Sequence, residues 1–170
     1  TNNERFGPEI GIAETLHGNK FDGKVMLVKF AQGATSLYNQ WMSPSSGRSG
    51  QLYSAMLEYF SMCMDNLENL GYYPELKAIC WMQGEDDSSS SEYYKYETLE
   101  ENFINDLRND LAYYSSSEGI YFIDAGISDC SAWTHHQEVN QAKLNNSNKS
   151  DLNIYFSTIE NGLKYNLEPV

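Results

Sequence analysis

Four short apolar runs alternate with longer amphipathic segments along this chain, and the alternation restricts its fold more than any other feature. We predict that the apolar runs form strands, at residues 24–31, 76–82, 119–127 and 152–159. We predict that the intervening segments form helices, at residues 8–18, 50–71, 93–114 and 135–146. Strands that alternate with helices form parallel sheets through right-handed crossovers. The sequence therefore predicts an α/β fold with three layers, α/β/α, in which helices cover both faces of the sheet.

Length and charge limit the organisation and the partners of the chain. The 170 residues fit one domain, and we expect a single domain over 1–170. The formal net charge of -13 disfavours nucleic acid, whose phosphates would be repelled, and also an anionic membrane surface. The cysteines and histidines show no zinc-binding spacing, and no motif points to another metal or cofactor. We therefore expect a single acidic domain without nucleic acid, membrane, metal or cofactor.

Two of the predicted strands end in the same dipeptide. Residues 24–31 are followed by Gln32 and Gly33, and residues 76–82 by Gln83 and Gly84. In parallel α/β sheets, ligands bind beyond the carboxyl ends of the strands. The Gly33 N–H and the Gln83 amide are donors that can form part of an oxyanion hole. The residue pattern by itself leaves open that the glycines only serve as turn residues.

The segment after residue 80, "CWMQGEDD", also carries a resemblance to a family. It fits the pattern W-x-Q-G-E-x-D, and "KVMLVKFAQGATSLYNQW" is similar to a second block of the same family. Over residues 5–159 the chain resembles the SGNH-type carbohydrate esterases, in the sialate O-acetylesterase-like branch that includes acetylxylan esterases. The resemblance implies a flavodoxin-like parallel sheet and deacetylation of an acetylated carbohydrate by serine acyl transfer, without a cofactor. It also implies a secreted or periplasmic location.

The resemblance assigns roles to individual residues. Gly33 and Gln83 match the positions that hold the oxyanion. The acidic positions of the third block correspond to Glu85 and Asp87, which we expect to brace the loop. Ser36 and Trp81, which lie within the two matching blocks, are expected at the edge of the substrate site.

Two blocks of the family do not occur in these 170 residues. The sequence has no G-Q-S-N, which would hold the nucleophilic serine, and no D-x-x-H, which would hold the base and its orienting acid. We therefore expect the chain to be the central portion of such an esterase, truncated at both ends and lacking the first strand of the sheet. Residues 24–31 would then have no neighbouring strand, and the exposed edges would favour self-association.

The residue pattern leaves three alternatives open. One is a catalytic system within the chain, built from Ser36 and His136, but no G-x-S-x-G elbow surrounds Ser36. The second is a non-catalytic carbohydrate-binding or scaffold domain of the same fold. The third is a flavodoxin-like phosphate or nucleotide site at "AQGATSLYN", where neither G-x-G-x-x-G nor G-x-x-x-x-G-K-[ST] is present.

Overall fold

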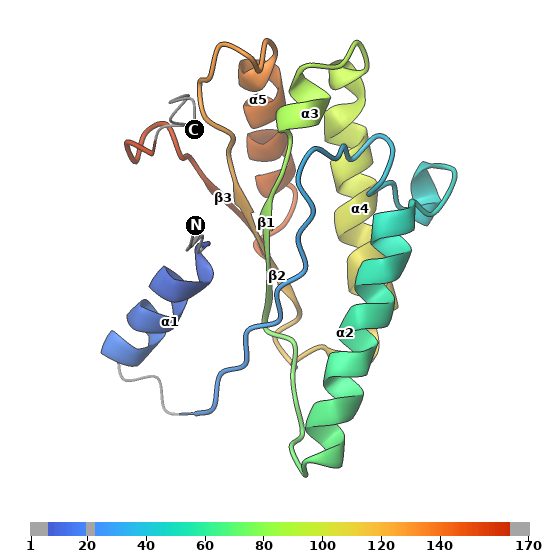
Figure 1. Cartoon of the computed structure of the whole chain (residues 1–170), viewed down its shortest axis with the longest axis vertical. Helices are drawn as coiled ribbons and strands as arrows, with labels where there is room; N and C mark the ends of the chain where they lie inside the picture. Colours follow the sequence, from blue (N-terminus) through green and yellow to red (C-terminus); the bar gives the residue numbers. More distant parts are fainter. Residues whose placement is uncertain (1–6, 20–22, 164–170) are drawn as a thin grey trace, which may run out of the picture. The chain divides into compact units, whose positions relative to one another are not determined.

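The structure, a computed structural model, describes residues 7–19 and 23–163. The chain divides into two compact units, Thr1–Ala31 and Gln32–Val170. Figure 1 shows both units, and each is described by itself below.

The first unit contains one helix and a segment without regular secondary structure. Helix α1 spans Glu9–Gly18, which confirms the predicted helix over 8–18. The strand predicted over 24–31 is wrong, because these residues form no strand in the structure. A strand depends on backbone hydrogen bonds to a neighbour, and no described segment forms a ladder with these residues. The apolar side chains at positions 25–28 are accordingly 40–52% exposed.

A parallel three-stranded sheet forms the centre of the second unit. Its strands are β1 (Ala78–Met82), β2 (Tyr121–Ala125) and β3 (Asn153–Phe156), in the order β1-β2-β3. They confirm the other three predicted strands, each within a few residues of its expected ends. The register pairs Trp81 with Asp124 and Asp124 with Tyr155, so these three residues lie in one row across the sheet. The second unit therefore has the predicted parallel α/β fold.

Helices flank this sheet, and three of them match predicted spans within a few residues, whereas the short helix at Glu85–Ser88 lies where no helix was predicted. The helices are α2 (Gln51–Asn69), α3 (Glu85–Ser88), α4 (Tyr96–Asp110) and α5 (His136–Ser147). Short 3-10 turns lie at Pro44–Ser46 (η1), Tyr93–Lys95 (η2) and Ala112–Tyr114 (η3). In Figure 1, α4 and α5 lie side by side against the sheet, and α2 lies along α4. No helix in the described ranges is long and apolar enough to cross a membrane.

Aromatic rings from the sheet, α2 and α4 form the centre of the core. Phe103 of α4 lies 4.6 Å from Trp81 and 6.3 Å from Phe122 between ring centroids. Tyr53 of α2 contacts the same ring at 5.8 Å, and its hydroxyl donates to Asp110 Oδ2 at 2.6 Å. The apolar stripe of α4 is buried at Leu99, Phe103 and Leu107, and Leu111 continues it just after the helix ends. This burial fixes α4 on the sheet.

Successive side chains of β1 point to opposite faces of the sheet. Trp81 is buried toward α4, whereas Cys80 and Met82 are exposed on the other face. In β3, Ile154 and Phe156 are exposed as well, and the register places Ile154 in the row of Cys80 and Phe156 in the row of Met82. Within the second unit, α4 and α5 therefore cover one face, and the opposite face presents apolar side chains.

Candidate functional site

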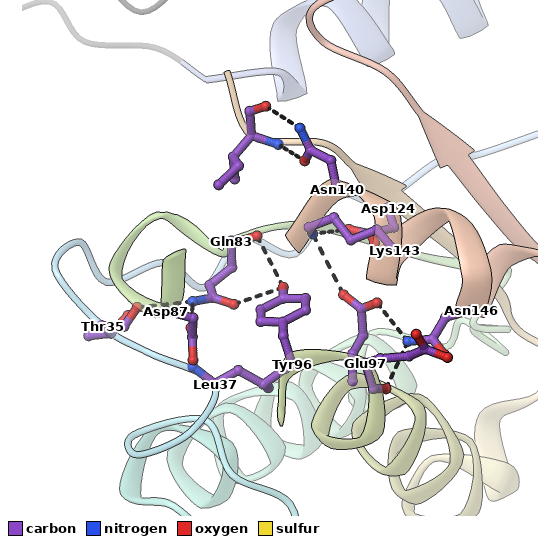
Figure 2. A network of polar contacts seen from close by, with 12 residues as sticks. Thr35, Leu37, Gln83, Asp87, Tyr96, Glu97, Asp124, Asn140, Lys143 and Asn146 are labelled. Atoms are coloured by element: carbon purple, nitrogen blue, oxygen red, sulfur yellow. Dashed lines mark hydrogen bonds and ion pairs between the residues drawn. The ribbon is translucent and has the colours of Figure 1, made fainter. Parts of the chain in front are cut away.

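The turn that follows β1 is hydrogen-bonded to the segment that begins at Gln32. Gln83 is buried directly after the strand, and its side-chain amide donates to Thr35 O at 3.1 Å. The same nitrogen donates to Asp87 Oδ2 at 2.5 Å. Figure 2 shows both contacts. One amide group therefore joins the two segments in which the sequence predicted a shared site.

Asp87 adds further hydrogen bonds between the same two segments. Its carboxylate accepts the Leu37 N–H at Oδ2 (2.8 Å) and the Tyr38 N–H at Oδ1 (3.1 Å), as Figure 2 shows for Leu37. Burial raises the pKa of the Asp87 carboxyl above its ordinary value, although these three hydrogen bonds oppose the shift. A buried carboxylate needs such donors, because desolvation is otherwise costly. We name this set of contacts between residues 35–38 and 83–87 the loop junction.

Tyr96 fixes the orientation of the Gln83 amide. Its buried hydroxyl lies 3.1 Å from Gln83 Oε1 and 3.2 Å from Gln83 O, and donates to these acceptors. Burial raises the pKa of Tyr96 well above its ordinary value, so the hydroxyl keeps its proton. The opposite amide orientation would place Oε1 against Thr35 O and Asp87 Oδ2, two oxygens that cannot donate a hydrogen bond. The amide nitrogen therefore points into the loop junction.

Gly84 allows the chain to turn directly after Gln83. Its φ of +136° lies where residues with a side chain are strongly strained. A Cβ at this position would also lie 2.8 Å from Val139 Cγ1 of α5. Backbone geometry and close packing thus both require glycine at position 84. The turn at this glycine places α3, which carries Asp87, next to residues 35–38.

Asp87→Asn should destabilise the protein by about 1–3 kcal/mol. The amide NH₂ of the new side chain would face at least one of the N–H groups of Leu37, Tyr38 and Gln83, which leaves a buried donor unpaired. Chemical denaturation measures the change in the free energy of unfolding. Asp86→Asn, on the exposed side of the same short helix, is the matched control and should change it by less than about 0.5 kcal/mol. Equal effects of the two variants would contradict a bracing role for Asp87.

The other residues assigned from the sequence lie around the loop junction. Gly33 is exposed, and its N–H has no hydrogen-bond partner among the described residues. Glu85 is half-buried at the start of α3, where its carbonyl accepts from the Ser88 hydroxyl at 2.7 Å. Ser36 is buried, and its hydroxyl lies 3.3 Å from Gln40 Oε1. Trp81 is part of the core, because β1 directs it toward α4.

Several residues that shape the site carry no signal that we read from the sequence. Thr35 takes part through its carbonyl, a group that every residue has. Tyr96 acts from a separate helix. Asn140 of α5 holds the turn after β2, because it donates to Ile127 O and accepts from Ile127 N, both at 2.8 Å (Figure 2). The helix around Asn140 is polar at most positions, so no sequence pattern singles this residue out.

A buried cluster of charges lies between α4, α5 and β2. Lys143 Nζ lies 2.5 Å from Asp124 Oδ1 and 3.6 Å from Glu100 Oε1, and Asn146 donates to Glu100 Oε2 at 2.9 Å. All four side chains are buried, and Figure 2 labels Lys143, Asp124 and Asn146 of this cluster. Burial raises the pKa of Asp124 well above its ordinary value, although attraction to Lys143 lowers it. The pKa of Lys143 is raised: burial lowers it, but attraction to Asp124 and Glu100 outweighs that effect.

The chemistry available at the loop junction is hydrogen-bond donation. The Gln83 amide is a donor at the carboxyl end of β1, and the exposed Gly33 N–H is a second donor two residues before Thr35, whose carbonyl the amide contacts. In the described ranges, no group of three His, Cys, Asp or Glu side chains lies close enough to hold a metal ion. The fold and the junction thus define a parallel α/β protein with a buried polar network at the carboxyl end of β1, the part of such folds where ligands generally bind.

Comparison with known proteins identifies the family. A family model described as carbohydrate esterase, sialic acid-specific acetylesterase, matches residues 1–163. The chain belongs to this family, which agrees with the resemblance found in the sequence and supports a general carbohydrate acetylesterase function with an acetylated carbohydrate as substrate. No match to a curated protein or to a solved structure reaches significance.

Proposed function

We propose that this chain supplies the oxyanion side of an SGNH-type carbohydrate O-acetylesterase site that uses serine acyl transfer. Gly33 N–H and the Gln83 amide stabilise the tetrahedral oxyanion, while Asp87 and Glu85 hold the loop that carries Gln83. The nucleophilic serine and the histidine base come from sequence outside these 170 residues, because neither G-Q-S-N nor D-x-x-H occurs within them.

The proposal rests on the hydrogen bonds that Gln83 makes in the loop junction. Gln83 Nε2 contacts Thr35 O at 3.1 Å, which brings the amide to the segment that starts with Gln32 and Gly33. An oxyanion at this place would compete with Thr35 O for one amide proton, and the shorter contact to Asp87 Oδ2 would hold the other. Donors that are held in place before the reaction stabilise a developing charge more effectively than mobile water.

The reaction follows the usual course of acyl transfer. The serine oxygen attacks the acetyl carbonyl carbon, and the histidine takes the serine proton. The negative charge of the tetrahedral intermediate lies on the former carbonyl oxygen, where the two donors bind it. The sugar hydroxyl then leaves with the proton from the histidine, and water releases acetate from the acetyl-serine in a second attack.

A second candidate is a non-catalytic carbohydrate-binding domain of the same fold. The missing serine and histidine motifs favour it, and so does the burial of Ser36, whose hydroxyl contacts Gln40. The two candidates differ in one measurable property, because only the esterase acquires activity when the adjoining encoded sequence is restored.

We expect the 170-residue chain alone to hydrolyse p-nitrophenyl acetate no faster than its Ser36→Ala variant. The same chain extended on both sides by the residues that its gene encodes should hydrolyse the ester with burst kinetics, as an acyl-enzyme accumulates. Turnover of the unextended chain that Ser36→Ala abolishes would contradict the proposal, since it would place the nucleophile at Ser36. An inactive extended protein would favour the binding domain.

A further inference from the structure

A contiguous group of aromatic side chains lies beside the loop junction. Tyr93 stacks on His135 with ring centroids 3.5 Å apart and planes 5° from parallel. Tyr94 contacts the Tyr93 ring at 6.1 Å, edge to face. Lys95 Nζ lies 5.6 Å from the Tyr94 ring centroid and 5.0 Å from that of Tyr38. We name these five residues the aromatic rim.

Two backbone contacts attach the aromatic rim to the proposed site. The Tyr38 N–H donates to Asp87 Oδ1 at 3.1 Å, so the first ring follows directly from the loop junction. The His135 N–H donates to Ser88 O at 3.1 Å, at the end of α3. Both ends of the rim are therefore fixed to the short helix that carries Asp87.

The outer rings of the rim are open to solvent. Tyr94 is 66% exposed and Tyr38 is 36% exposed, whereas His135 and Tyr93 cover one face of each other. Exposed tyrosines offer a large rigid face and a polar hydroxyl at a low cost in conformational entropy. The C–H faces of sugar rings pack on such aromatic faces, and their hydroxyl groups remain available for hydrogen bonds.

Local charge limits which sugar fits this surface. The single lysine, Lys95, already forms an ion pair with Glu92, and His135 faces Glu138 at 3.2 Å. Asp86 is exposed on α3, which joins the rim to the junction, and the chain as a whole carries -13. A carboxylated sugar would meet a negative field without an unpaired cation among these groups.

We propose that the aromatic rim is a subsite for an uncharged sugar ring of the substrate glycan, next to the sugar that carries the acetyl ester. This inference rests on the proposed function for the position of the ester. Tyr94 and Tyr38 supply the stacking surface, and the acidic surroundings select against sugars with a carboxylate. The chain would accordingly act on acetylated glycans whose neighbouring residues are neutral.

Binding of two matched probes to the 170-residue chain tests the subsite without any catalytic step. The probes are lacto-N-neotetraose, which is uncharged, and its sialylated form, which adds one carboxylated sugar. Ligand-observed NMR titration gives the dissociation constants. We expect the uncharged probe to bind more tightly at low salt, and the difference to narrow as added salt screens the charges.

Tyr94→Ala should weaken binding of the uncharged probe about three- to tenfold, because an aromatic contact is lost. Tyr113→Ala is the control, since Tyr113 is 83% exposed in η3, beyond the other end of α4. No binding, equal binding by Tyr94→Ala and the unchanged chain, or a preference for the sialylated probe that Tyr94→Ala abolishes would overturn the subsite. Loss of hydrolysis in the extended protein with binding retained would count against the proposed function alone.

Discussion

Gln83→Ala is expected to lower the kcat of the extended, active esterase about 100- to 1,000-fold, the usual cost of losing one oxyanion donor. KM should change little, because the donor gains strength only when charge develops on the carbonyl oxygen. Steady-state kinetics with an acetylated sugar or with p-nitrophenyl acetate measures both constants. The variant should also lose some stability, since Asp87 Oδ2 and Thr35 O each lose a donor.

The kinetic effect can be separated from the structural one. Asp87→Asn disturbs the same loop junction but leaves the Gln83 amide in the chain, so its kcat should fall less than that of Gln83→Ala. Gln137→Ala, at an exposed position of α5, should change neither kcat nor thermal stability. An unchanged kcat in Gln83→Ala would show that the amide only joins two loops, and the oxyanion role would have to be abandoned.

Lys143→Met should destabilise the protein by roughly 3–5 kcal/mol, the largest effect on stability that we expect. The substitution keeps an unbranched side chain of similar size but leaves Asp124 and Glu100 buried without the ammonium group that lies 2.5 Å and 3.6 Å from them. Chemical denaturation measures the loss. Lys149→Met is the control, because Lys149 forms its ion pairs with Glu97 and Glu101 at the surface, where such pairs contribute less than about 1 kcal/mol.

The decrease in the free energy of unfolding that Lys143→Met causes should be smaller at low pH than at high pH. Burial already raises the pKa of Asp124, and removal of the cation raises it further. A carboxyl group whose pKa is raised on folding contributes stability below its ordinary pKa and loses it as the pH rises through the raised value. The deficit of the variant relative to the unchanged protein should therefore be smaller at about pH 5 than at about pH 8. A deficit that does not change with pH would contradict the buried ionic cluster.

Helices were predictable where the apolar residues that repeat with the helical period are also the residues that pack against a neighbour. The stripe at Leu99, Phe103 and Leu107 repeats with the helical period, and α4 buries all three side chains. The pattern is less informative for α2 and the residue that follows it, where the apolar residues spaced three and four apart include Tyr59 and Leu70. Both are exposed, and Tyr53 and Met64 are buried instead, because the face of a helix that becomes buried depends on which neighbour it meets.

Residues 24–31 show the limit of the same reasoning for strands. Their apolar composition matches a buried strand, and the other three runs did form one. A helix satisfies its own backbone, but a strand exists only when a second strand accepts its hydrogen bonds. No described segment does so here, and no property of the run itself could have shown this.

The sequence by itself determined the class of fold, the family and the two Gln-Gly turns, because hydrophobic period and the motif at Trp81–Asp87 are local properties. Only the tertiary structure decided that the turn after β1 meets the segment after Gly33 at Thr35. The contacts of Gln83 with Thr35 and Tyr96 join residues that are distant along the chain, and they depend on backbone carbonyls and side-chain orientation. The buried ion pair of Lys143 with Asp124 also depends on the tertiary structure, since charged residues become buried partners only when folding removes them together from water.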